Sequence, residues 1–218
     1  MIDGLPAQVT SVNVGGIARL ETPRRTVDSA IVKRPVQGRV RIEGVNLAGD
    51  DQADRKVHGG VDRAVYAYAV EDYAWWEGKL RAPLAPGTFG ENLTTAGIDL
   101  NAAVVGERWE LGDAELQVSA PRIPCSKLAA RVGDPRFVAR FGDARRPGPY
   151  LRITRPGTIA AGDRIRVVAR PAHGIRIVDV FVIYLFERAR LGELLAAPEL
   201  GPAWIAWIHE QLAAREDR

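Results

Sequence analysis

Short apolar runs dominate the first 170 positions of the chain, and glycine or proline lies between most of them. Runs rich in valine, isoleucine and aromatic residues, with some alternation of apolar and polar positions, are typical of strands joined by turns. Many short strands with few long helices favour a barrel or a strongly curved sheet. We therefore predict a mainly β fold with some α structure, with strands at 9–14, 29–33, 38–43, 64–69, 107–111, 115–119, 150–154 and 164–169.

Helical spacing appears within this β pattern and again after it. Residues 71–80 and 135–141 repeat apolar side chains three or four positions apart, which predicts two helical insertions. Beyond His173 the same spacing predominates and places Val178, Val182, Leu185 and Phe186 on one predicted face. Breaks at proline and glycine divide this C-terminal part into about three short helices.

The length of 218 residues allows one large domain, or one domain with a small addition. The spacing of apolar residues changes from strand-like to helical near 171–174, where a Pro and a Gly flank His173. We therefore expect a barrel-like domain over residues 1–172 and a three-helix segment over residues 173–218.

Composition excludes several classes of protein. Hydrophobic residues make up 46% of the chain and charged residues 26%, as in ordinary globular proteins, so neither a disordered nor a membrane-spanning class is indicated. A net charge of +3 is too small to indicate nucleic-acid binding. The N-terminus has neither the basic nor the apolar region of a secretory signal. We expect a cytoplasmic protein that binds neither nucleic acid nor membrane.

The chain has a single cysteine, Cys125, which excludes an intramolecular disulfide and a Cys-rich zinc or iron–sulfur site. It follows a predicted strand, at the expected start of a helix, with Arg122 and Lys127 close in sequence. Helix N-termini and neighbouring cations favour a thiolate, which is both a nucleophile and a soft metal ligand. The alternative is a small buried apolar residue, the usual role of a free cysteine.

Residues 49–63 are too polar for a core, and adjacent Gly59 and Gly60 allow the backbone to approach a ligand. Lys56, His58 and Arg63 offer donors suited to a phosphate or to developing negative charge. A charged surface loop with a glycine turn is the alternative interpretation.

Two more segments could present polar groups to a ligand. Between a predicted helix and the next strand, Glu91 could accept from amine donors and Asn92 could both donate and accept, or the segment could be a well-capped turn. Further upstream, Lys33 and Arg34 form a cationic pair at a strand end, where surface charge is the alternative.

Together these segments resemble the MOSC domain family of molybdenum cofactor proteins. The matching motifs occur in the family's order, as Lys33-x-Pro-Val-x-Gly, Gly49-Asp-x-Gln-x-Asp with His58-Gly-Gly-x-Asp-Arg, Pro86-Gly-x-Phe-Gly-Glu-Asn-Leu and Pro121-Arg-x-Pro-Cys125. The resemblance extends from about residue 9 to 169 and includes the helical C-terminal extension. It implies a barrel-like domain that binds a molybdenum–pterin cofactor and reduces N-hydroxylated compounds, nucleobase analogues among them. Binding of pyridoxal phosphate is also compatible with the resemblance.

The resemblance implies a role for each of the polar residues singled out above. Cys125 matches the family cysteine whose thiolate binds molybdenum, with His58 and Asp62 near the metal or the pterin. Anion contacts are expected from three cations at strand ends or loops, where a charge is easily solvated: Lys33, Lys56 and Arg122. The remaining cofactor-binding residues implied are Asp54, His58, Gly59, Arg63, Glu91 and Asn92. Arg34 stands where related sequences commonly carry a small or polar residue.

Three functions are compatible with these residues. The first is a molybdenum-dependent reductase of N-hydroxylated compounds, with catalytic Cys125, His58 and Asp62. The second is a carrier that delivers the cofactor, or sulfur on Cys125, without turnover. The third is a metal-free thiol enzyme, for which His58 would be the only base. The chain has no G-x-G-x-x-G motif for a nicotinamide cofactor, so a reductase would need an external electron-transfer protein. A monomer or a dimer is expected.

Overall fold

The computed structural model describes residues 6–53 and 59–216. Within these residues the strands are β1 (Gln8–Val14), β2 (Ala18–Glu21), β3 (Thr26–Ser29), β4 (Arg34–Pro35), β5 (Val40–Glu43), β6 (Asn46–Leu47), β7 (Val65–Ala69), β8 (Leu93–Ala96), β9 (Arg108–Leu111), β10 (Ala114–Pro121), β11 (Pro149–Arg155), β12 (Gly157–Ile159) and β13 (Arg166–Ala169). The helices are α1 (Val70–Leu80), α2 (Ser126–Val132), α3 (Phe137–Ala144), α4 (Ile177–Leu185) and α5 (Pro202–Glu216), with short 3₁₀ turns η1 (Val61–Arg63), η2 (Arg188–Ala196) and η3 (Pro198–Leu200).

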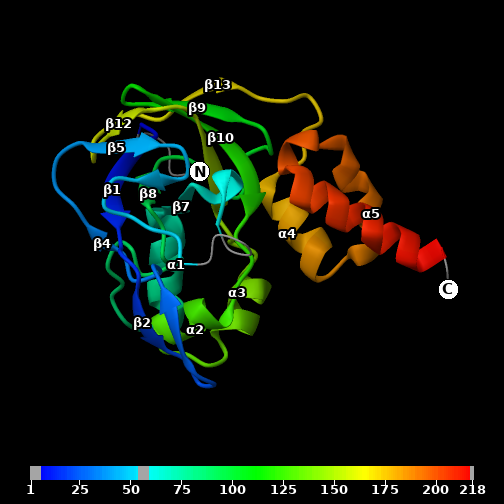
Figure 1. The fold of residues 1–218 in the computed structure, drawn as a ribbon, viewed down its shortest axis with the longest axis horizontal. Helices are drawn as coiled ribbons and strands as arrows, with labels where there is room; N and C mark the ends of the chain where they lie inside the picture. Colours follow the sequence, from blue (N-terminus) through cyan, green and yellow to red (C-terminus); the bar gives the residue numbers. More distant parts are fainter. Residues whose placement is uncertain (1–5, 54–58, 217–218) are drawn as a thin grey trace.

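Eight of these strands form one curled sheet in the order β13-β9-β10-β11-β7-β8-β1-β4 (Figure 1). Neighbours in this sheet are antiparallel except β7 and β8, which are parallel and are joined through α1. The small sheet β12-β5-β6 and the hairpin β2-β3 complete the β structure of the described residues. The mainly β, barrel-like fold with helical insertions is therefore confirmed.

The central strands of the sheet are buried on both faces. Every residue of β7 and of β8 is buried, which suits a parallel pair covered from two sides. The apolar run at 64–69 predicts β7. Strand β8 contains two threonines and therefore lacks an apolar pattern, although all its residues are buried. Apolar pattern alone therefore located the first of these central strands and not the second.

One predicted strand, at 29–33, is wrong. The observed strand β3 ends at Ser29, and residues 30–33 cross beneath the loop at 86–90 without pairing into a sheet. A side chain at Gly87 or Gly90 would collide with this segment, because a Cβ built there lies 2.6 Å from the Lys33 carbonyl oxygen or from Ile31 respectively. Both glycines also have positive φ angles. The close crossing of two segments replaces the expected strand.

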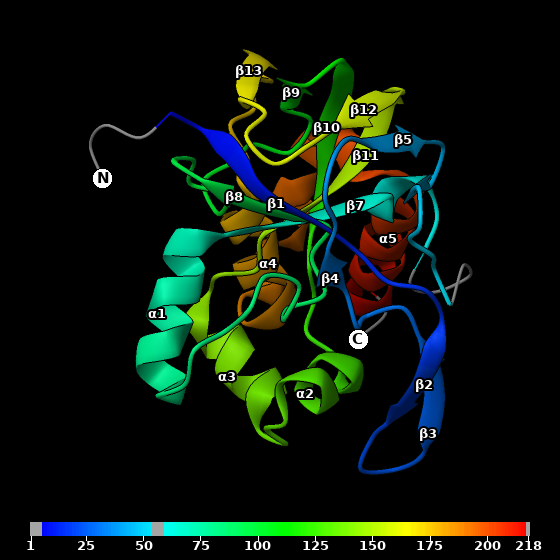
Figure 2. The same ribbon diagram turned by 90° about the vertical axis from the view of Figure 1, so that its left-hand side faces the viewer.

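Helices α1, α3 and α2 lie at one end of the sheet, and α2 lies next to the β2-β3 hairpin (Figure 2). An aromatic cluster joins them, in which Trp76 lies 4.7 Å from Phe137 between ring centres and the Trp76 indole donates to the Tyr68 hydroxyl. Helix α2 begins at this end of the molecule, and Cys125 is its N-cap residue.

The C-terminal helices pack beside β10 (Figure 1). The predicted apolar face of α4 is not the buried one: Val178, Val182 and Leu185 are only partly covered and Phe186 is 47% exposed. The buried side chains are instead Ile177, Val180, Phe181 and Ile183. Because α4 is apolar on nearly every side, its periodicity could not identify the face that the sheet covers.

The C-terminal segment shares its core with the sheet. Ile177, Val180 and Leu194 belong to the same cluster of buried apolar residues as Trp109 and Val118 of the sheet. Separate units over 1–172 and 173–218 stay a prediction, because shared burial does not test independent folding. No helix among the described residues is both long and apolar enough to span a bilayer.

This shared core can be tested at Ile183, which is 2% exposed on α4. We expect Ile183→Val to lower the free energy of unfolding by about 0.5–1.5 kcal/mol, as for other buried methylene deletions. In urea unfolding followed by far-UV circular dichroism, one cooperative transition should shift as a whole. Two transitions, only one of them shifted by the substitution, would show that the C-terminal segment unfolds independently.

Candidate active site

A cavity of about 120 Å³ opens where β7, β10 and β11 approach the start of α2. Five of the predicted site residues line it: Lys33, Arg63, Asn92, Arg122 and Cys125. Residues separated by up to about ninety positions in the sequence therefore meet at one place. Asp62, Gly59 and Glu91 do not line the cavity, and Asp54, Lys56 and His58 lie outside the described residues.

Cys125 is held by the first turn of α2. It has an extended backbone, with φ −140° and ψ 169°, and its carbonyl oxygen accepts hydrogen bonds from the amides of Leu128 and Ala129. The side chain is half-buried and lines the cavity together with Arg122 and Lys127. The cationic surroundings expected from the sequence are therefore present around the only thiol of the chain.

Arg122 is a buried cation that forms no ion pair with a carboxylate of the described residues. It is 6% exposed, lies 5.2 Å from the centre of the Tyr66 ring, and donates to the Tyr150 hydroxyl at 3.3 Å. Its Nε atom is buried without a hydrogen-bond partner. Burial acts to lower the pKa of this guanidinium, but nearby Tyr150, Cys125 and Tyr66 outweigh it and raise the pKa, so the group is charged.

Lys33 is buried as well, at 7% exposure, and its ammonium pairs with the carboxylate of Asp50. Burial lowers the pKa of Lys33, and Asp50 opposes that shift. The expectation of easily solvated charges at Lys33 and Arg122 is therefore wrong. The crossing at 30–33 carries Lys33 under the loop at 86–90, where Asp50 rather than water compensates its charge.

Asn92 links three segments of the cavity wall by hydrogen bonds. Its Nδ2 donates to Asp50 at 2.8 Å and to the Asn13 carbonyl at 3.3 Å, and its Oδ1 accepts from the Tyr66 amide at 3.1 Å. Both amide hydrogens are thus used within the protein. Asn92 fixes the position of Asp50, and through Asp50 that of Lys33.

Glu91 lies beneath the cavity, fully buried. Its Oε1 accepts hydrogen bonds from the Tyr73 hydroxyl and the Gly87 amide, both at 2.6 Å, and from Thr94 at 2.9 Å. Oε2 is buried without a partner, and burial raises the pKa of this carboxyl. These contacts fix the loop at 86–90 that covers Lys33; a contact of Glu91 with pterin or substrate stays a prediction.

The raised pKa of Glu91 predicts how stability depends on pH. Between the ordinary Glu pKa of 4.5 and the higher folded value, the folded chain binds more protons than the unfolded chain, so stability falls as pH rises. We expect Glu91→Gln to remove this part of the fall, as measured by urea unfolding at about pH 5 and about pH 8. The exposed Glu43→Gln serves as control. An identical fall in the wild type and Glu91→Gln would contradict the prediction.

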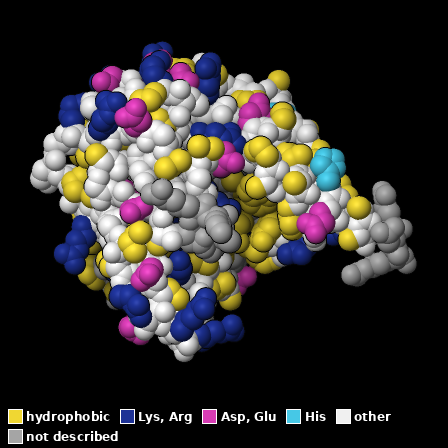
Figure 3. Space-filling view, in the orientation of Figure 1, with side chains coloured by type: hydrophobic (Ala, Val, Ile, Leu, Met, Phe, Trp, Pro, Cys, Tyr) yellow, Lys and Arg dark blue, Asp and Glu magenta, His cyan; other side chains and the backbone are white. Residues whose placement is uncertain are grey.

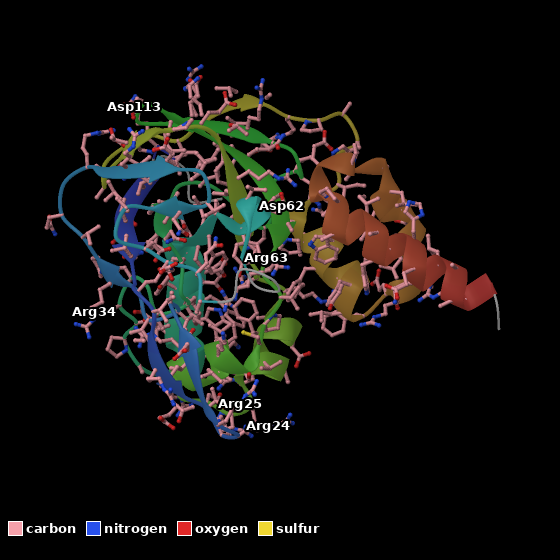
Figure 4. The ribbon with its side chains drawn as sticks, viewed as in Figure 1. Arg24, Arg25, Arg34, Asp62, Arg63 and Asp113 are labelled. Carbon is pink, nitrogen blue, oxygen red and sulfur yellow. The ribbon has the colours of Figure 1, made fainter. Side chains whose placement is uncertain are left out.

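Residues 50–53 and Arg63, on the two described flanks of the segment at 49–63, line one side of the cavity. Gln52 accepts from the Gly60 amide at 2.8 Å and donates to the Arg63 carbonyl at 3.1 Å, which ties the two described flanks of this segment together. The Arg63 guanidinium lies 5.9 Å from the centre of the Tyr150 ring. Asp62 instead pairs with Arg152. Figure 4 shows Asp62 and Arg63 between the sheet and the C-terminal helices, and Arg34 far away at the edge.

The cavity residues that the sequence analysis did not name as individual candidates include Asp50, Tyr66 and Tyr150. Asp50 lies in the polar segment that was singled out, so composition gave a signal for it. The tyrosines lie in predicted strands, where aromatic residues are ordinary core residues, and nothing local distinguishes them.

Among the described residues, no group of three or more His, Cys, Asp or Glu side chains is placed to hold a metal ion. The half-buried Cys125 thiol offers one soft ligand to a metal carried by an organic cofactor. The unpartnered Nε of Arg122 fits an anionic group of such a cofactor. The residues present thus fit a molybdenum–pterin group.

The comparisons agree with the curled sheet. The model of the MOSC domain matches residues 54–166, and the chain belongs to the MOSC domain family. MOSC domains are associated with the molybdenum cofactor. The function of this chain is therefore a molybdenum cofactor-associated one.

Three relatives illustrate the match. Uncharacterized protein YflK of Bacillus subtilis is 37% identical over 169 residues, 78% of this chain and 76% of YflK. A protein of Gibberella moniliformis named reductase is 35% identical over 151 residues, 66% of this chain but 26% of that protein. The crystal structure of YiiM from Geobacillus stearothermophilus has a TM-score of 0.79 and 30% identity, over 95% of this chain and 100% of YiiM.

Proposed function

We propose that this chain is a molybdenum cofactor-dependent reductase of N-hydroxylated compounds, in which the Cys125 thiolate binds the metal. The observation that carries the proposal is that the only thiol and a buried guanidinium without a carboxylate partner among the described residues line one cavity. Membership of the MOSC family and the similarity to a protein named reductase support an oxidoreductase.

In the proposed reaction an N-hydroxylated amine gains two electrons and two protons, its N–O bond breaks, and an amine and water leave. The bound cofactor supplies two-electron redox chemistry at molybdenum. Arg122 would bind an anionic group of the cofactor through Nε, while its terminal nitrogen donates to Tyr150. The Tyr150 hydroxyl keeps its own hydrogen while it accepts from Arg122, and can donate it to a ligand. His58 is the other proposed proton donor.

The electrons would come from a separate electron-transfer protein. The sequence lacks the glycine-rich turn that binds a nicotinamide dinucleotide, and one cysteine cannot hold an iron–sulfur cluster. Reduced viologen should therefore replace the natural donor, and NADH alone should not.

The experiment uses full-length protein purified from a host that makes the molybdenum cofactor, mixed with an N-hydroxylated purine and reduced viologen. Chromatography should show the amine product, and protein from a host without cofactor biosynthesis should give none. Cofactor-loaded protein that turns over neither purine nor other N-hydroxylated compounds would contradict the proposal and favour a carrier.

A further inference from the structure

A second cavity, of about 310 Å³, lies between the sheet and the C-terminal helices. We call it the aromatic cleft, because Tyr184 of α4 and Trp204 and Trp207 of α5 line it. Figure 3 shows hydrophobic side chains gathered in this hollow. The residues that line both cavities are Arg63, Ile123, Cys125 and Tyr150. The boundary between the two cavities therefore depends on how η1 and the C-terminal helices are held against β11.

An ion pair holds η1 against β11. The Nε atom of Arg152 donates to the carboxylate of Asp62, and these two side chains are 17% and 28% exposed. The hydroxyl of buried Ser119 donates to the Asp62 carbonyl oxygen at 2.6 Å. Tyr150 lies two positions from Arg152, on the same face of β11. Consecutive residues of η1 thus meet neighbouring side chains of one strand face, and the Arg63 guanidinium lies 5.9 Å from the centre of the Tyr150 ring.

The same guanidinium holds the C-terminal segment. Nη2 of Arg152 donates to the Glu199 carbonyl oxygen at 2.7 Å, and Nη1 donates to the Gln117 side chain at 3.0 Å. Gly201, between η3 and α5, packs directly on the ion pair, because a Cβ built there would lie 2.6 Å from Asp62 Oδ2 and 2.7 Å from Arg152 Nη2. Its φ angle of +94° also favours glycine. The ion pair that fixes η1 therefore also fixes the start of α5.

From these contacts we propose that Asp62 and Arg152 are positioning residues of the candidate active site. Their ion pair keeps Arg63 beside Tyr150 at the boundary of the two cavities and keeps the start of α5 next to them. Neither of these two described side chains lines either cavity, so each acts through the segments that it joins. The inference rests on the proposed function for the reaction that these segments serve. It gives Asp62 a role other than contact with the metal or the pterin.

The opposite charges of the two residues provide a sharp test. Asp62→Asn removes a negative charge and Arg152→Met removes a positive one, so direct electrostatic effects on the site would have opposite signs. Loss of a pair that positions the site has the same sign in both variants. Arg155→Met is the matched control, because Arg155 lies on the same strand, is half-exposed and pairs with Glu110 instead.

Hydrogen exchange of full-length, cofactor-free protein, followed by mass spectrometry, gives the first readout. Peptides that cover residues 59–65 and 199–205 should exchange about tenfold faster in Asp62→Asn and in Arg152→Met than in the wild type, because each substitution releases both segments. Arg155→Met should leave both peptides unchanged. Circular dichroism checks that each variant is folded.

Viologen-driven turnover of the cofactor-loaded protein, normalised to its molybdenum content, gives the second readout. The kcat should fall about tenfold in each single variant and no further in the double variant, because the second substitution finds the pair already broken. The pH dependence of kcat should keep its midpoints, since neither group exchanges a proton in the reaction. A pair that serves stability alone would leave kcat of the folded, loaded protein at the wild-type value.

The outcomes separate this inference from the proposed function. Unchanged exchange of both peptides in either single variant overturns the inference, whether or not the wild type turns over. Wild-type kcat in both variants, changes of kcat in opposite directions, or loss of a pH midpoint in Asp62→Asn overturns it as well. If the loaded wild type reduces nothing, the proposed function fails, and faster exchange of both segments still supports the pair as the group that positions the two walls.

Discussion

Replacing Cys125 by serine should remove nearly all molybdenum from the purified protein, a loss of about hundredfold or more. A serine hydroxyl is a harder and far less acidic ligand than a thiol, so it does not bind molybdenum as a thiolate does. Even residues that only orient a metal ligand change affinity by about 10–100-fold when substituted. Among the described residues no His, Asp or Glu cluster is available to take over the metal.

The measurement is elemental analysis of wild type and Cys125→Ser purified from the same cofactor-competent host. Ser126→Ala is a matched control, because the neighbouring side chain is exposed and does not line the cavity. Thermal unfolding should be nearly the same for all three proteins, since serine replaces a half-buried thiol of similar size. Equal molybdenum in wild type and Cys125→Ser would remove Cys125 from the ligands of the metal.

Replacing Arg122 by methionine should weaken cofactor retention and stabilise the cofactor-free protein at the same time. Loss of a charge-assisted contact costs about 1.5–3 kcal/mol, which corresponds to a drop of about 10- to 100-fold in affinity. In the cofactor-free chain the same guanidinium is buried with an unpartnered Nε and no carboxylate partner among the described residues. An apolar side chain of similar length leaves no buried donor without a partner, so the free energy of unfolding should rise by about 1 kcal/mol.

Two measurements test these two effects separately. Urea unfolding of cofactor-free protein measures stability, and the cofactor content of protein from a cofactor-competent host measures retention. Arg24→Met removes the same charge from the exposed tip of the β2-β3 hairpin and should change neither quantity (Figure 4). Arg122→Lys keeps a cation and should retain more cofactor than Arg122→Met. A destabilised Arg122→Met protein with unchanged cofactor content would show that Arg122 serves the fold alone.

Local sequence was sufficient for features that depend on near neighbours. Alternation and turn residues located β1, β7 and β11, and the spacing of aromatic residues located α1, because strand and helix periodicities need only a few consecutive residues. The position of Cys125 between a strand and a helix was predicted in the same way. Motif order then indicated the family, which the comparisons confirm.

The tertiary structure decided which of these residues meet and which are buried. Lys33 and Asp50 are 17 positions apart, and Asp50 and Asn92 are 42 apart, so no local pattern shows that they form one buried network. The same holds for the buried face of α4 and for the aromatic cleft, since each is defined by a surface from another part of the chain. The sequence by itself located β1, β7, β11 and α1, the thiol and its neighbouring cations. Burial, charge pairing and the junction of the two cavities at Cys125 arose only in the fold, because they depend on contacts between distant segments.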